Sequence, residues 1–301
     1  MLTLFTIIHP FVDACSVSVL IAGGMTWERV IAYNAMAFAL QLPAGVFMDC
    51  CPHLNRIGFF VGTGMVITAT VLAAIGFGGW GVLAVVCIGN ALFHLTAGKN
   101  ILETREGRAG PIGFFIATGA LGLMAGQVWA AKTAATCLWI FAAVLAVLVA
   151  LALAMKWETC GRMIARKQSD DRMLRQMLAL GALFVLIAWR SWAGLLVSGR
   201  SADECVFMMC AGAAVSFAGK VFGGYLSECS GRWRVVVASV LGSAALAFMH
   251  HPSWTAVWLI LLFVAQLATG PVLSLVYDRT ERRGGLAFGL NCFGLFAGSL
   301  A

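Results

Sequence analysis

Charged residues are scarce in this sequence: Asp, Glu, Lys and Arg make up 11% of its 301 residues, whereas 61% are hydrophobic. Soluble domains carry about 25% charged residues, so this composition provides too few charges to cover a surface that faces water. The mean hydropathy of +0.93 points the same way. The composition therefore excludes a soluble enzyme and a nucleic-acid-binding domain, despite the net charge of +7.

Several catalytic motifs are also absent. The sequence has no phosphate-binding loop of the form G-x-x-x-x-G-K-[ST], which argues against ATP-driven work, and no H-E-x-x-H or G-x-S-x-G motif. None of its ten cysteines forms a C-x-x-C pair, so we expect neither a metal nor a cofactor. An enzyme is not expected. An intramembrane enzyme that acts on lipid through His9, Asp13 and His94 stays open as the alternative from another class, although these residues form no compact motif.

Long apolar stretches take up most of the chain. A helix needs about 20 mostly apolar residues to cross a membrane, and clusters of charged and turn-forming residues divide the chain into eleven pieces of about this length. They lie at residues 2–23, 30–48, 57–77, 80–100, 111–131, 134–155, 176–198, 204–226, 235–250, 254–276 and 285–301. The expected fold class is an all-α polytopic membrane protein with 11 transmembrane helices.

The basic residues set the expected orientation. Most of them lie in the loops after the even-numbered spans, whereas the opposite loops hold only Arg29, Lys132 and Arg200. Because cytoplasmic loops carry the excess of Lys and Arg, the amino terminus should lie in the cytoplasm. The first span carries His9 and Asp13 and has no basic segment before it, so we expect a retained helix rather than a signal peptide.

A polar segment at residues 157–175 divides the chain into an N-terminal six-span unit, 1–156, and a C-terminal five-span unit, 176–301. Features recur across this segment at near-constant spacing. Gly45 and Asp49 at the end of span two correspond to Gly224 and Glu228 at the end of span eight. Such spacing indicates a duplicated unit of the kind found in secondary transporters. We therefore expect two helical bundles joined by a cytoplasmic linker.

The segment 224–234 resembles the signature of the major facilitator superfamily of secondary transporters. That signature is a Gly, an acidic residue four positions on, then Gly-Arg and further basic residues. The second-half copy holds Gly224, Glu228, Gly231, Arg232 and Arg234, and the first-half copy keeps Gly45, Asp49 and Arg56 but lacks the Gly-Arg pair. The resemblance implies a two-bundle fold and a gating motif whose charge pairs stabilise the outward-facing state. The alternative is that these residues are ordinary topology determinants.

Three shorter segments are similar to the fosmidomycin-resistance type of efflux carrier within this superfamily: HPFVD at 9–13, GNALFH at 89–94 and RSWAG at 190–194. Such carriers usually have twelve helices, so a 6+5 arrangement implies a missing twelfth helix, either by truncation or in an eleven-helix variant. The resemblance implies an antiporter of the bacterial inner membrane that exports small compounds and confers drug resistance. We expect a monomer.

An ionisable side chain inside a span raises the free energy of membrane insertion by about 2.5–3.5 kcal/mol, so its presence indicates a functional role. Asp13 lies near the middle of span one, and His9 precedes it by one turn on the same face. A buried carboxyl can gain and lose a proton and an imidazole can relay it, so this pair is predicted to couple transport to protons. The alternatives are a structural pair that holds the first helix, or an Asp13 that neutralises Arg190.

Arg190 lies near the middle of span seven, the repeat partner of span one. Its planar guanidinium suits a carboxylate, a phosphate or a phosphonate, which predicts the substrate anchor. Lys220, Asn90, His94 and Gln41 are predicted to be further substrate contacts, although helix packing explains each of them as well.

The expected function is proton-coupled secondary transport by alternating access, with export of a small anionic organic compound or drug. Uptake of a small organic anion by the same machinery is the alternative. The expected partners are the anion, protons and the lipid bilayer, with no nucleic acid.

Overall fold

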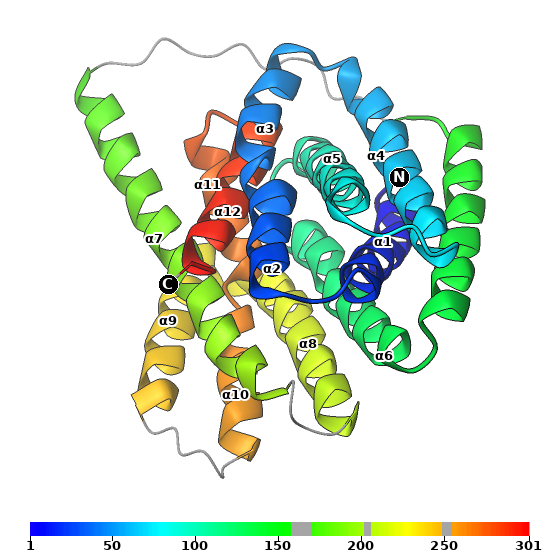
Figure 1. Cartoon of the computed structure of the whole chain (residues 1–301). Helices are drawn as coiled ribbons and strands as arrows, with labels where there is room; N and C mark the ends of the chain where they lie inside the picture. The colour runs from blue at the N-terminus through cyan, green and yellow to red at the C-terminus, as the bar shows by residue number, and fades with distance from the viewer. Residues whose placement is uncertain (158–169, 202–205, 249–254, 301) are drawn as a thin grey trace.

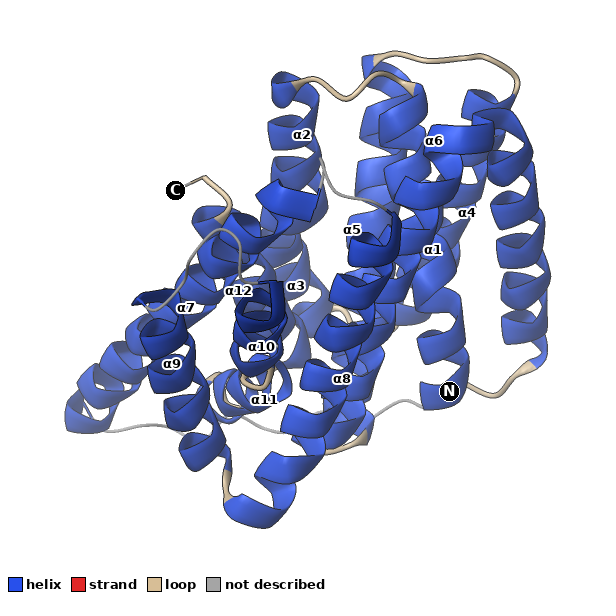
Figure 2. Ribbon diagram, turned by 90° about the horizontal axis from the view of Figure 1, so that it is seen from below, coloured by secondary structure: helices blue, strands red, loops and turns tan. Residues whose placement is uncertain are grey.

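A computed structural model of the chain describes residues 1–157, 170–201, 206–248 and 255–300. Regular structure in these ranges is helical throughout, with no strand (Figure 2). The helices are α1 (Leu2–Ala22), α2 (Trp27–Asn34), the π-helix η1 (Ala35–Ala39), α3 (Gln41–Cys50), α4 (Leu54–Ala74), α5 (Trp80–Thr104), α6 (Ala109–Ala154), α7 (Asp170–Ser201), α8 (Val206–Ser230), α9 (Arg232–Phe248), α10 (Thr255–Gln266), α11 (Thr269–Arg279) and α12 (Gly284–Gly298).

The helices confirm the all-α polytopic fold class. Within the described ranges, nine helical stretches are long and apolar enough to cross a membrane. The other two predicted spans correspond to α9, with 17 residues, and to α12, with 15. Spans five and six both lie in α6, as the stretches Ala109–Ala130 and Ala135–Ala154. Residues 158–169 of the predicted linker lie outside the described residues, and the predicted domain boundaries stay a prediction.

Two predicted spans are interrupted rather than regular. Span two comprises α2, η1 and α3, and the Gln41 side chain donates a hydrogen bond to the Ala37 carbonyl in the π-helical turn (2.7 Å). Span ten divides into α10 and α11, and Pro271 stands in the first turn of α11. Proline fits there because the first backbone N–H groups of a helix have no partner within the helix. π-helical turns are frequent at functional sites.

Figure 1 shows α1, α4, α5 and α6 on one side of the molecule and α7, α9, α10 and α11 on the other. The two sides meet mainly along two helix pairs, α3 with α12 and α6 with α8, with further contacts between α5 and α12 and between α6 and α11. A Cβ atom on Gly45 would overlap the Gly285 carbonyl oxygen, and one on Gly113 would lie 2.9 Å from the Lys220 carbonyl oxygen. Glycine is therefore what allows these helices to approach so closely.

Buried aromatic rings fill the space among α1, α4, α5 and α6. Phe5, Phe59, Phe93 and Phe115 are fully buried, and neighbouring ring centroids in this series lie 5.2 to 6.3 Å apart. The imidazole of His9 stacks on the Phe115 ring, with 4.5 Å between centroids. This aromatic packing fixes the His9 side chain inside the first-half helices.

Candidate functional site

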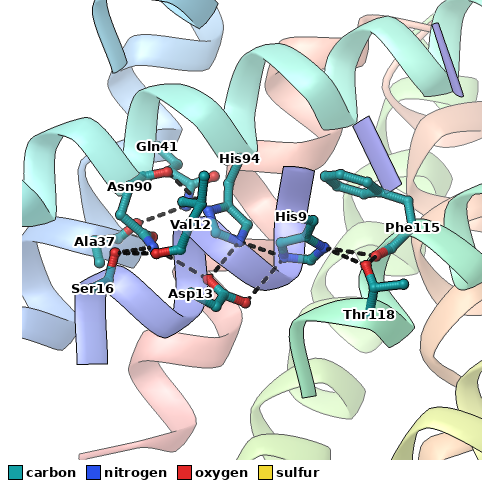
Figure 3. Close-up of polar contacts among 10 residues, drawn as sticks. All are labelled: His9, Val12, Asp13, Ser16, Ala37, Gln41, Asn90, His94, Phe115 and Thr118. Carbon is teal, nitrogen blue, oxygen red and sulfur yellow. Dashed lines mark hydrogen bonds and ion pairs between the residues drawn. The ribbon is translucent and has the colours of Figure 1, made fainter. Parts of the chain in front are cut away.

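Three ionisable side chains converge between α1 and α5 (Figure 3). His9 and Asp13 stand one turn apart on α1, and His94 reaches them from α5. The two Nε2 atoms lie 2.8 Å apart. The Asp13 carboxylate is 3.2 Å from Nε2 of His9 through Oδ2 and 3.3 Å from Nε2 of His94 through Oδ1. His9 and Asp13 are buried and His94 is partly buried, so this cluster is shielded from bulk water.

Backbone carbonyls fix the tautomers of both imidazoles in the cluster. Nδ1 of His9 lies 2.7 Å from the Phe115 carbonyl oxygen, and Nδ1 of His94 lies 2.9 Å from the Asn90 carbonyl oxygen. A carbonyl only accepts hydrogen bonds, so each Nδ1 carries a hydrogen. The hydrogen bond between the two Nε2 atoms then needs one more proton on one ring. In this conformation the cluster therefore holds one imidazolium next to the Asp13 carboxylate.

The cluster is also the one group of three or more His, Cys, Asp or Glu side chains in the described ranges whose donor atoms converge closely enough to share a cation. Two imidazoles bound to a tetrahedral zinc ion at 2.0–2.1 Å would place their nitrogens about 3.3 Å apart. The observed 2.8 Å between the Nε2 atoms is shorter and is a normal hydrogen-bond length. The spacing therefore suits a shared proton better than a metal ion.

Neighbouring residues hold the cluster in place. Asn90 donates from Nδ2 to Oδ1 of Asp13 (3.3 Å) and to Oγ of Ser16 (3.0 Å). On α6, a Cβ atom at Gly119 would lie 2.5 Å from Oδ2 of Asp13 and 2.8 Å from Nε2 of His9. Only glycine leaves room for the cluster at this position. The glycine-rich composition of span five is visible in the sequence, but which of its glycines faces Asp13 is decided by packing.

Arg190 and Lys220 supply positive charge from the second half of the chain. Nη1 of Arg190 donates to Oγ1 of Thr269 (2.8 Å), and its buried Nε has no hydrogen-bond partner among the described residues. Within the same ranges neither Arg190 nor Lys220 has a carboxylate within 4.0 Å. In this conformation Asp13 pairs with His9 and His94, and it forms no ion pair with Arg190. The Lys220 ammonium is repelled by the Arg190 guanidinium and attracted by the Asp13 carboxylate.

Arg190, predicted as the substrate anchor, is partly buried. Its side chain borders a small cavity inside the second-half helices, together with Ser239, Ser243 and Ala268. Gln41 is completely buried, and its Oε1 has no hydrogen-bond partner in the described part of the chain. Asn90 and His94, predicted as substrate contacts, belong to the cluster around Asp13. The structure thus brings His9, Asp13, Asn90 and His94 into direct contact. Lys220 makes no comparable contact with this cluster in the described ranges, but its positive charge is attracted by Asp13.

The predicted gating residue Asp49 binds the beginning of a helix from the other half. Its Oδ1 accepts the backbone N–H of Gly285 (2.9 Å) and its Oδ2 accepts that of Leu286 (2.8 Å), in the first turn of α12. A carboxylate is favourable there because the N–H groups are unpaired and the helix dipole is positive at this end. Lys99 on α5 also contacts Asp49 (2.7 Å) and Glu103.

Glu228 makes the corresponding contact in the second half. Its Oε1 accepts the backbone N–H of Gly110 (2.9 Å) in the first turn of α6, and its Oε2 pairs with Arg108 (2.7 Å). Arg232 contacts Asp278 and Ser274, each at 2.7 Å. Because each acid binds a helix of the other half, we call the Asp49 and Glu228 contacts the two interbundle latches.

Not every residue of the predicted gating motif takes part in these latches. Arg56 lies over the Phe60 ring, 5.9 Å from its centroid, and has no ion pair in the described ranges. Arg234 is exposed and donates to the Ser230 carbonyl (3.3 Å). Gly231 adopts a positive φ of 97° at the turn between α8 and α9, which favours glycine. Sequence analysis missed Lys99 as a latch residue, although its four-residue spacing to Glu103 on one helix face was a signal.

By sequence, no family profile and no curated protein matches the chain. By fold, the chain is similar to solved structures of transporters. FucP, a Major Facilitator Superfamily transporter in the outward conformation, superposes with a TM-score of 0.71 at 11% identity over 99% of this chain and 89% of FucP. A variant of the E. coli fucose:proton symporter FucP gives a TM-score of 0.65 at 11% identity over 99% and 88%. The human organic anion transporter MFSD10 (TETRAN) gives 0.72 at 14% identity over 99% and 91%. The chain is thus a multi-pass helical membrane protein with the two-bundle fold of the major facilitator superfamily of transporters.

Proposed function

We propose that this protein is a secondary transporter that moves a small organic anion in a proton-coupled cycle of alternating access. One observation carries the proposal. The membrane helices hold a cluster that shares a proton, formed by His9, Asp13 and His94. The Lys220 ammonium is attracted by Asp13 of this cluster and repelled by Arg190, so the two positive charges act on the same region. Ionisable groups inside a membrane are expensive and mark ion and substrate pathways. Lys and Arg side chains that have no ion-pair partner among the described residues favour an anion, and a carboxylate with two imidazoles favours a proton.

The latches support alternating access. Two bundles that meet mainly through α3 with α12 and α6 with α8 can rock about these contacts, and the Asp49 and Glu228 latches hold one packing. We propose that the latch end is cytoplasmic, in agreement with the predicted cytoplasmic amino terminus. The conformation described here is then closed toward the cytoplasm. A monomer in the bacterial inner membrane agrees with this arrangement, because both bundles come from one chain.

The direction of transport has two candidates. Export of an anionic compound or drug by antiport follows from the sequence likeness to fosmidomycin-resistance carriers. Uptake is the alternative, and one structural neighbour is described as a fucose:proton symporter and another as an organic anion transporter. A lipid-modifying enzyme is less well supported, because the cluster uses its Nε2 atoms and carboxylate in mutual contacts and no serine or cysteine nucleophile touches them in the described ranges.

The test is proton flux in liposomes that contain the purified protein and an internal pH dye. Methanesulfonate and methylphosphonate are added outside, and the wild type is compared with Asp13→Asn and Arg190→Gln. We expect anion-dependent proton flux in the wild type and its loss in both variants. Arg175→Gln is the matched control, because Arg175 is exposed and stands in the first part of α7, about four turns before Arg190. If neither of these anions moves protons in folded wild-type protein, the proposal is wrong. Lipid turnover by the same sample would instead favour the enzyme.

A further inference from the structure

The number of protons in the cluster bears on the coupling between proton and anion, given the proposed function. With both Nδ1 atoms donating to carbonyls, a cluster that has lost the shared proton would place two Nε2 lone pairs and a carboxylate within 2.8 to 3.3 Å of one another. Three acceptors without a hydrogen between them repel each other. Loss of the shared proton must therefore separate the Asp13 carboxylate from at least one of the two imidazoles.

The charges that face the cluster determine where Asp13 can turn after deprotonation. From α8, the Lys220 ammonium interacts electrostatically with Asp13, and from α2 the buried Tyr33 phenol does so as well. A phenol is ordinarily neutral near pH 7, so of these two groups it is Lys220 whose positive charge attracts a deprotonated cluster. From α6 the cluster meets the uncharged Thr118 and Gly119. A deprotonated cluster thus offers Lys220 an internal carboxylate in place of an external anion.

Proton loss also lowers the positive charge of the whole site. With its proton, the cluster is neutral overall, as one imidazolium and one carboxylate. Lys220 and Arg190, which have no carboxylate within 4.0 Å in the described part of the chain, add two positive charges. Without its proton, the cluster carries one negative charge. Both effects, the lost charge and the competing carboxylate, weaken anion binding. Since coupling between two ligands is reciprocal, a bound anion must strengthen proton binding to the same degree.

We infer that the anion and the proton bind this site together rather than in competition, so that both cross the membrane in the same direction. Under an inward proton gradient this co-binding drives uptake of a small carboxylate, sulfonate or phosphonate. It therefore favours the uptake alternative over the antiport expected from the sequence likeness. Antiport would require the opposite coupling, in which binding of the proton weakens binding of the anion.

The experiment measures proton uptake when an anion binds to purified protein in a weakly buffered solution with a pH indicator. The probes are lactate and methanesulfonate, which stay fully ionised between about pH 6 and pH 8, so that any proton taken up belongs to the protein. We expect proton uptake on binding near pH 7.5. The affinity for the anion should rise about tenfold from pH 8 to pH 6, a usual size for coupling between two ligands.

Variants assign the proton to the cluster. His94→Gln should abolish the proton uptake and flatten the pH dependence of affinity. His53→Gln should leave both unchanged, because His53 is exposed and lies outside the cluster. Proton release on binding, or an affinity that rises with pH, would overturn the inference while leaving proton-coupled transport intact. If neither anion binds at either pH while the flux assay is also silent, the proposed function and this inference both fail. If another anion is active in the flux assay, that anion replaces lactate and methanesulfonate as the probe. Proton uptake on its binding then supports the inference, and proton release overturns it.

Discussion

The Lys99 ammonium occupies in the first half the role that the Arg232 guanidinium has in the second. Lys99 pairs with Asp49 and Glu103, and Arg232 pairs with Asp278 and bonds to Ser274. Ser274 and Asp278 on α11 share the four-residue spacing of Lys99 and Glu103 on α5. The first-half signature lacks its Gly-Arg pair, and a lysine from the neighbouring span supplies the missing charge.

This relationship predicts that Lys99→Met destabilises the protein strongly. Lys99 is 3% exposed, and its removal leaves two partly buried carboxylates without their cation. Removing one partner of a buried ion pair costs about 3–5 kcal/mol. The change is measured as the free energy of unfolding in detergent or as the shift in melting temperature. Arg56→Gln serves as the control and should change stability by less than about 0.5 kcal/mol, because Arg56 is exposed. A mild effect of Lys99→Met, similar to that of Arg56→Gln, would contradict the role assigned to Lys99.

Gly119→Ala should disrupt the cluster. Its Cβ atom would lie 2.5 Å from Oδ2 of Asp13, so the carboxylate or α6 must shift. Overpacking of this kind costs about 1–3 kcal/mol, and proton-coupled flux should fall at least tenfold. Gly64→Ala is the matched control, because a Cβ at Gly64 meets nothing within 4 Å and alanine favours a helix. Wild-type flux in Gly119→Ala would show that the cluster geometry is not needed for coupling.

Arg190→Lys should weaken anion binding even though it keeps the charge. The guanidinium can donate to Thr269 through Nη1 and still present Nε and its other nitrogen to an anion, whereas an ammonium lacks this planar arrangement. We expect about a tenfold loss of affinity, and a larger loss for Arg190→Gln. Equilibrium binding of the active anion measures both. Arg175→Lys should bind as the wild type does, and an unaltered affinity in Arg190→Lys and Arg190→Gln would remove Arg190 from the anion site.

Glu228→Gln should shift the equilibrium between the two packings of the bundles. The neutral amide loses the pairing with Arg108 and much of the attraction to the first turn of α6. A carboxylate at a helix amino terminus contributes up to about 2 kcal/mol, which corresponds to roughly a thirtyfold change in population. Spin labels at His53 and Arg234, one in each half and both exposed, should report a longer distance component. Glu106→Gln, an exposed residue of the same loop region, should leave the distance distribution unchanged.

Local composition was enough to predict the helices. The eleven predicted spans each overlap a helix, because hydropathy and the length of a membrane crossing are properties of one segment at a time. The same information could not predict the π-helical turn at Ala35–Ala39 or the break between α10 and α11. Those depend on how a helix packs against its neighbours, and the π-helical turn lies against both α5 and α12.

The sequence by itself determined that this chain is a helical membrane protein and that Asp13 and His9 stand on one face of the first helix, and it predicted a duplicated unit. Only the tertiary structure decided their partner. The hydropathy of the sequence could not predict whether Asp13 pairs with Arg190 or with the imidazole of His94, because the pairing depends on how closely α5 and α6 approach α1. Gly119 permits that approach, and His94 then completes a hydrogen bond that requires a shared proton. In the same way, Asp49 of the latch pairs with Lys99 rather than with Arg56, because helix packing brings the Lys99 ammonium next to this carboxylate.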